Sequence, residues 1–345
     1  MDDISVRGAL IPNGVVLAAM TLLAFAMTRA AGIDGYGLVP DYLWPSLSAV
    51  AIGLLVWAAF TLAALARNGE ERPARALIGN LARRVEMLLL PALIQPLFFA
   101  AFTAAKTAIA PLAHFSWDGA LTLADATMFG MDPWRITHGL IGPAGSLFLE
   151  FLYTMVWGVA LGFIPVLVAL FATRRFTGRF FLALNLSWLI GGIGIASAMP
   201  AAGPVFAHLF EPGLAHHFDA LSRLLAQQLA PDGPILHTQA YLAAMIGKPI
   251  AEEGGGISAM PSMHMATAML YVLAARGTRW RAPAIVFAVL TAIGSVHFGY
   301  HYVMDAVVAV GLTWGCWKAA GFWFTGRHRL SALAWEAPVE RQTPG

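Results

Sequence analysis

The chain has little charge and almost no cysteine. Only 12% of its 345 residues are charged and 59% are hydrophobic, so a soluble globule of this size would have too little polar surface. The one cysteine, Cys316, excludes an internal disulfide and a cysteine-based metal cluster, and we expect it to pack as a small side chain. There is no nucleic-acid-binding motif and no basic patch, so no nucleic-acid partner is expected. The composition therefore predicts a multi-pass membrane protein.

Long apolar runs are what the sequence has in abundance. A helix needs about 20 apolar residues to cross a bilayer. The first run follows Asp2 and Asp3 and ends near Arg29, which favours a membrane anchor over a cleaved signal peptide. The pattern predicts an all-α, polytopic helical membrane protein with eight spans, near residues 10–30, 44–66, 87–112, 144–172, 180–200, 260–276, 283–299 and 303–324.

The arginines alternate between the two sides of this predicted bundle. Most of them lie in three connecting segments, 67–84, 173–179 and 276–281, and the connections between these carry few basic residues. Because short cytoplasmic loops carry the excess of Lys and Arg, both termini are predicted to be cytoplasmic. The long connection 201–259 is then extracytoplasmic. The alanine-rich composition indicates a bacterial inner membrane.

Polar side chains gather at the predicted outer ends of the last three spans. The segment Pro261-Ser262-Met263-His264 opens one span, Ser295 and His297 close the next, and His301 and Asp305 open the last. On a helix, residues four apart share a face, so Asp305 can accept a hydrogen bond from one ring nitrogen of His301 and leave the other free to attack. This pattern predicts phosphoryl transfer with His301 as nucleophile, Asp305 as orienting residue and His264 as general acid.

These segments resemble a known family, the type-2 phosphatidic acid phosphatase superfamily, and within it the inositol phosphorylceramide synthase branch. The resemblance covers roughly residues 115–315. It implies a metal-independent reaction without a cofactor, in which His301 becomes a phosphohistidine, Asp305 orients it and His264 protonates the departing alcohol. The positions that carry it, in order, are Asp118, Asp125, Phe129-Gly130, 200–204, 259–264 and 301–305.

The chain departs from the wider superfamily at three phosphate-binding or motif positions. Lys106 is not followed by the Arg-Pro pair of the superfamily, since Ala113 and His114 stand there. Ser295 replaces a phosphate-binding arginine, and Met263 replaces a glycine. These differences favour a transferase over a simple phosphatase. Lys106 is then a candidate phosphate partner, with snorkelling to the interface as the alternative.

Several other side chains are candidate substrate ligands. Asp118 and Asp125 lie two helical turns apart in a predicted interfacial helix, where they could bind hydroxyls of an inositol or sugar acceptor, or act only as solvated or capping residues. His297 precedes His301 by four, so we expect it to share that helix face, where it could contact phosphate, or complete a zinc site with His264 and Asp305, although the resemblance implies no metal. The expected substrate-binding residues are Ser262, His297, Ser295, Asp118, Asp125 and Lys106.

Motifs and spans together predict three segments. Residues 1–114 form N-terminal transmembrane helices, 115–326 a catalytic membrane domain, and 327–345 a disordered cytoplasmic tail. The predicted function is transfer of a phospho-alcohol headgroup from a phospholipid or lipid-phosphate donor to a lipid alcohol acceptor, in phospholipid or sphingolipid metabolism. Two alternatives stay open. One is hydrolysis of a lipid phosphate or polyprenyl diphosphate, and the other is a proton-coupled transporter with a His and Asp relay.

Overall fold

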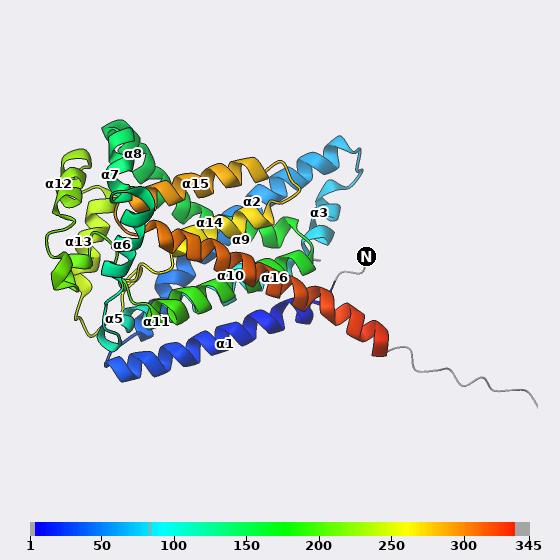
Figure 1. Ribbon diagram of the computed structural model, residues 1–345. Coiled ribbons are helices and arrows are strands. Elements are labelled where there is room, and N and C mark those ends of the chain that lie inside the picture. The colour runs from blue at the N-terminus through cyan, green and yellow to red at the C-terminus, as the bar shows by residue number, and fades with distance from the viewer. Residues whose placement is uncertain (1–3, 83, 335–345) are drawn as a thin grey trace, which may run out of the picture.

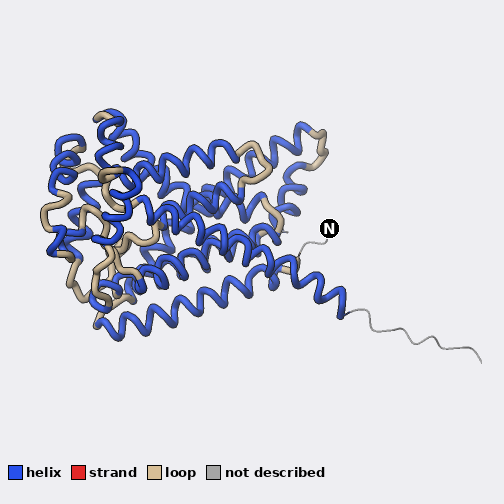
Figure 2. The backbone as a smooth tube through the Cα atoms, in the orientation of Figure 1, coloured by secondary structure: helices blue, strands red, loops and turns tan. Residues whose placement is uncertain are grey.

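The protein is a helical bundle with a cap of short helices at one end. The computed structural model describes residues 4–82 and 84–334, and this part of the chain contains helices, turns and loops but no β-strand (Figure 2). Long helices run side by side, and several short helices gather at one end of the bundle (Figure 1). The predicted all-α, polytopic membrane fold is confirmed.

Five segments of the described chain are long and apolar enough to cross a membrane, and they coincide with the first five predicted spans. Three of them are interrupted by a π-helical turn, a one-residue insertion that rotates the side chains that follow it. The segments are Val6–Ala31 (α1), Val39–Arg67 (α2), Val85–Leu112 (with α4, Gln95–Thr107, and α5, Ile109–Leu112), Pro143–Phe171 (α8, Pro143–Phe151, and α9, Trp157–Phe171) and Arg174–Ala198 (α10, Arg174–Leu189, and α11, Ala196–Ala198).

The last three predicted spans correspond to α14 (Met263–Ala274), α15 (Arg281–His297) and α16 (Val303–Ala334). With 12 and 17 residues, α14 and α15 are shorter than the about 20 residues that a full crossing needs. The five segments described above are long enough to cross a bilayer, whereas α14 and α15 are not. Helix α16 continues to Ala334, into the segment predicted as a tail, and the remainder of that segment, 335–345, lies outside the described residues.

Helix α10 lies in the interior and packs against α1, α14 and α16. Small residues permit the close approach, since a side chain at Gly178 would meet Phe324 at 2.9 Å and Ala9 at 3.1 Å. A buried amide pair adds a polar contact between α1 and α10, in which Asn185 Nδ2 donates to Asn13 Oδ1 over 3.3 Å. A polar contact inside an apolar bundle favours one register of the two helices, because a shift would separate Asn185 Nδ2 from Asn13 Oδ1.

The cap consists of α6 (Asp118–Phe129), α7 (Pro133–Leu140), α12 (Asp219–Gln228) and α13 (Pro234–Met245), with connecting turns. It is therefore built from two stretches, one before and one after spans four and five. The three arginine-rich connections lie at the opposite end of the bundle, where α3 (Pro73–Ala82) is also found (Figure 1). There Arg84 Nη1 donates to the Ala172 carbonyl over 3.0 Å and joins two of these connections.

Candidate active site

A cavity of about 350 Å³ lies where the cap meets the bundle. Lys106, His264 and His301 line it, although they come from α4, α14 and the loop before α16. Much of the remaining wall is apolar or aromatic and includes Phe102, Trp157, Trp188 and Leu242. An apolar chamber with a few convergent polar groups is typical of a binding site for an amphiphilic ligand.

The hydrogen bonds of His301 fix its tautomer. Nδ1 lies 2.8 Å from the Ala259 carbonyl oxygen and 3.3 Å from Asp305 Oδ2. Because a carbonyl oxygen can only accept, Nδ1 must carry the proton. Nε2 therefore bears the lone pair, and no hydrogen bond engages it within the described chain. A ring nitrogen in this state, on a side chain that lines a cavity, is available as a nucleophile.

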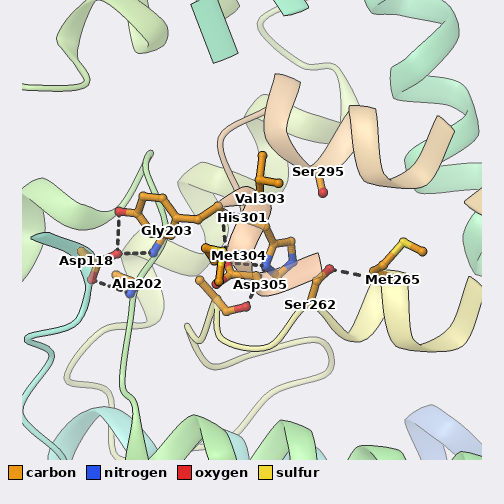
Figure 3. Close-up of polar contacts among 12 residues, drawn as sticks. Asp118, Ala202, Gly203, Ser262, Met265, Ser295, His301, Val303, Met304 and Asp305 are labelled. Carbon is orange, nitrogen blue, oxygen red and sulfur yellow. Dashed lines mark hydrogen bonds and ion pairs between the residues drawn. The ribbon is translucent and has the colours of Figure 1, made fainter. Parts of the chain in front are cut away.

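Asp305 is fully buried and holds the chain around His301. Its Oδ2 accepts from the Tyr302 amide over 2.9 Å as well as from His301, and its backbone carbonyl accepts from the Ser262 amide over 3.2 Å. Oδ1 has no hydrogen-bond partner within the described residues. Asp305 thus joins the His301 loop to the segment that carries His264 (Figure 3).

His264 lies in the first turn of α14, and the N-terminal end of this helix borders the cavity. Its ring centroid is 6.2 Å from that of His301, 4.3 Å from Tyr153 and 3.9 Å from Trp157. Ser262 caps the helix, and its hydroxyl accepts from the Met265 amide over 3.3 Å (Figure 3). The two imidazoles are therefore close enough to act on opposite sides of one phosphoryl group.

Asp118 is a buried anchor between the cap and the His301 loop. Its carboxylate accepts from the Ala202 and Gly203 amides, both over 2.7 Å, and from the Tyr302 hydroxyl over 2.9 Å (Figure 3). Burial raises the pKa of this carboxyl, and the three hydrogen bonds oppose the shift. Both oxygens are thus engaged by the protein itself.

Asp125 accepts from the first two amides of α16, Val303 over 2.8 Å and Met304 over 3.4 Å. It therefore caps that helix from another part of the chain. Burial raises its pKa to about 6, against the effect of these hydrogen bonds. The side chain borders a small second pocket that also contacts His301, and it does not line the larger cavity.

His297 and Ser295 lie apart from the cavity. The expectation that His297 shares a helix face with His301 is wrong, because α15 ends at His297 and the chain turns at Gly299 before α16 begins. Its two ring nitrogens lie 2.9 Å from Ser146 Oγ and 3.1 Å from Thr137 Oγ1, so His297 does not assemble a zinc site with His264 and Asp305. Ser295 Oγ donates to the carbonyl of Ala292, within its own helix.

Lys106 is the one side-chain cation among the described residues that line the cavity. It lies in the last turn of α4, and no hydrogen bond or ion pair engages its ammonium group within the described structure. Gly256 packs directly on its backbone, since a side chain there would approach the Lys106 carbonyl carbon to 2.9 Å. The ammonium group is thus free to meet an anion in the cavity.

Three features of the site carry no signal in the sequence. The Ala259 carbonyl is a backbone group, and Tyr153 and Trp157 stand four residues apart in an apolar span, where aromatic residues normally serve for packing. Trp157 also donates from Nε1 to the His264 carbonyl over 3.2 Å. Only the folded chain shows that both rings contact the imidazole.

Residues 120–319 match the PAP2 superfamily, the type-2 phosphatidic acid phosphatases. The chain belongs to this superfamily. The match begins in α6, ends in α16 and includes His264, His301 and Asp305. Separate comparisons with curated proteins and with solved structures give no match. Membership of the PAP2 superfamily supports a phosphatase or phosphotransferase that uses lipid substrates in a bilayer.

Proposed function

We propose that this PAP2 protein is a lipid phosphotransferase, similar to the inositol phosphorylceramide synthase branch, which moves a phospho-alcohol headgroup between lipids at the extracytoplasmic face. The observation that carries the proposal is the orientation of His301. Its Nδ1 is bound to the Ala259 carbonyl, and its free Nε2 belongs to a ring that lines the same cavity as His264 and Lys106. The family supports an enzyme over a proton-coupled transporter.

In the first step, the Nε2 lone pair of His301 attacks phosphorus in the donor. The bond between phosphorus and the oxygen of the leaving lipid alcohol breaks, and that oxygen takes a proton from His264. His301 is left phosphorylated on Nε2 and protonated on Nδ1. The Asp305 carboxylate and the Ala259 carbonyl stabilise this cation through their contacts with Nδ1.

In the second step, the acceptor alcohol gives its proton to His264 and attacks the same phosphorus. The N–P bond breaks, which restores the lone pair of His301 and the protonated form of His264. Lys106 contacts the non-bridging oxygens in both steps and offsets the negative charge of the transition state. The reaction exchanges one alcohol for another at phosphorus and consumes no reactant besides the donor and the acceptor.

The apolar character of the cavity favours transfer over hydrolysis. Phe102, Trp188 and Leu242 border the chamber that holds the two histidines, and such walls suit a lipid alcohol better than water. The carboxylates of Asp118 and Asp125 are both bonded to the protein, so we now propose that they position the His301 loop and do not bind the acceptor. Ser262 and Ser295 likewise shape the segments that carry the histidines.

A product assay tests the proposal. Purified protein is incubated with phospholipid carrying a labelled phosphate, with ceramide as acceptor or with a diacylglycerol whose acyl chains differ from those of the donor. We expect a new labelled lipid and, after an acid-free quench, label on the protein that is absent from His301→Ala. Free phosphate or phospho-alcohol as the only labelled product would contradict transfer and favour the phosphatase.

His237→Asn is the matched control for the histidine variant. His237 is exposed on α13 and does not line the cavity, so its loss should leave both the product and the protein-bound label unchanged. Loss of label in both variants would show that the label is not on His301.

A further inference from the structure

Tyr153 lies in the π-helical turn Leu152–Val156 in the fourth span, directly against the proposed general acid. Its ring is nearly parallel to that of His264, with an angle of 9° and a centroid separation of 4.3 Å. π-Helical turns occur frequently at functional sites, because the inserted residue redirects side chains toward a cavity. Tyr153 is one of the residues that line the cavity here.

The hydroxyl of Tyr153 is buried and unpartnered. The side chain is only 3% exposed, and its oxygen has no hydrogen-bond partner within the described residues. A buried hydroxyl without a partner destabilises a protein, and native structures rarely retain one without a reason. A ligand in the cavity would supply the missing partner.

Several of the other side-chain donors around the cavity are already engaged. Trp157 Nε1 donates to the His264 carbonyl over 3.2 Å, the Tyr300 hydroxyl to the Ile235 carbonyl over 3.2 Å, and Thr154 Oγ1 to the Glu150 carbonyl over 2.7 Å. Lys106 is the one cation along the walls within the described chain. A phosphoryl group in transfer spreads negative charge over several oxygens, so a single ammonium leaves some of them without a donor.

We propose that the Tyr153 hydroxyl donates a hydrogen bond to a non-bridging oxygen of the transferred phosphoryl group, beside His264. This inference rests on the proposed function and deepens it. Tyr153 supplies, from the fourth span, some of the hydrogen bonds to phosphate that an arginine would provide. Its ring also holds the His264 imidazole at a fixed distance from the leaving group that His264 protonates. It is a catalytic residue because its hydroxyl touches substrate.

The test compares Tyr153→Phe with Tyr271→Phe in purified full-length protein. Tyr271 is a buried tyrosine on the same helix as His264, and its hydroxyl already donates to the Ala160 carbonyl over 3.0 Å, so it is a matched control outside the cavity. Binding of orthovanadate, a phosphate mimic, is followed through the fluorescence of Trp157 and Trp188, which line the cavity. Turnover of labelled phospholipid and thermal unfolding in detergent are measured in parallel.

We expect Tyr153→Phe to weaken orthovanadate binding and turnover about tenfold or more, as the loss of a hydrogen bond to a charged group does. The same variant should unfold at an equal or higher temperature, because it loses an unpartnered hydroxyl, whereas a purely structural tyrosine would lower it. Tyr271→Phe should keep wild-type binding and turnover, with a lower unfolding temperature.

The outcomes separate this inference from the proposed function. If the wild type binds orthovanadate and Tyr153→Phe binds it equally well, the role of Tyr153 is wrong and the proposed function stands. If the wild type binds orthovanadate but turns over no lipid, the transferase fails, and the binding ratio still decides whether Tyr153 contacts phosphate. If the wild type neither binds orthovanadate nor turns over lipid, both proposals fall.

Discussion

Tyr302 and Asp118 form a buried hydrogen bond, with the hydroxyl 2.9 Å from Oδ1, that joins the C-terminal part of the family-matched region to a residue just before its start. Tyr302 is the neighbour of His301, and the same carboxylate binds the amides of Ala202 and Gly203. One side chain of the cap therefore fixes both the turn after the fifth span and the loop that carries the proposed nucleophile.

We expect Asp118→Asn to lower both stability and turnover. The amide group places a donor against backbone donors, so at least one buried N–H loses its acceptor, which costs about 1–3 kcal/mol in the free energy of unfolding. Denaturant unfolding in detergent measures this change. Asp232→Asn, an exposed position between α12 and α13, is the control and should change stability by less than about 0.5 kcal/mol. Equal effects at the two positions would refute an anchoring role for Asp118.

The role of His264 can be tested with leaving groups of different acidity. General acid catalysis contributes about 10²- to 10⁴-fold, so His264→Asn should lose that factor with an ordinary phosphodiester donor. A p-nitrophenyl ester needs no proton on its leaving oxygen, so the same variant should lose much less with it. Single-turnover rates of leaving-group release with the two donors give the comparison, because the second step needs His264 as a base with either donor. An equal loss with both would show that His264 acts in some other way.

The stability of the protein should depend on pH through Asp125. Burial raises its folded-state pKa to about 6, above the ordinary value of 3.8. Because the folded state holds this proton more tightly than the unfolded state, the protonated Asp125 carboxyl stabilises the fold. This contribution is complete below pH 3.8 and is lost as the pH rises through about 6. The thermal unfolding temperature of the wild type, relative to that of Asp125→Asn, should therefore decline between these two pH values and then level off. A flat difference across this range would contradict the shift.

Gly158 offers a way to narrow the cavity without disturbing the fold. It lines the chamber from the exposed face of α9, and a side chain there would meet nothing within 4 Å. Gly158→Leu should reduce turnover of long-chain lipids about tenfold, a factor typical of one steric change in an apolar pocket, and spare dihexanoyl donors. Gly162 lies one turn further along, is equally open and does not line the cavity, so Gly162→Leu is the control.

A loss of turnover in Gly158→Leu with both long-chain and dihexanoyl donors would point to damage at the histidines instead of a narrowed chamber. The same assay, run with a series of chain lengths, measures how far the chamber extends from the phosphoryl group.

Much of the fold was predictable, because long apolar runs indicate the membrane-spanning helices and the arginines indicate which connections lie at the same end of the bundle. The contact between His301 and Asp305 was also predictable from their spacing, although His301 lies before the first residue of α16. The same spacing failed for His297, since the helix ends there and the chain turns at Gly299, where φ is +69°. Residue spacing predicts a shared face only within one helix.

The partners of the Asp118 and Asp125 carboxylates could not be predicted, because their contacts join residues from 84 to 184 positions apart. Their types and positions in α6 are equally typical of solvated residues. Tyr153 was not predicted, because an aromatic residue in an apolar span normally serves for packing and gives no sign of a functional role. Only its unpartnered oxygen in the folded chain distinguishes it.

The long-range contacts of α6 also bear on the order in which the protein matures during synthesis. Asp118 and Asp125 emerge early, and their partners Tyr302, Val303 and Met304 emerge only with the last helix. Until then the proposed nucleophile His301, the proposed orienting residue Asp305 and the cap cannot be brought together. A nascent or truncated chain that lacks α16 would thus not react with the lipids around it, and activity would begin only when this helix is in place.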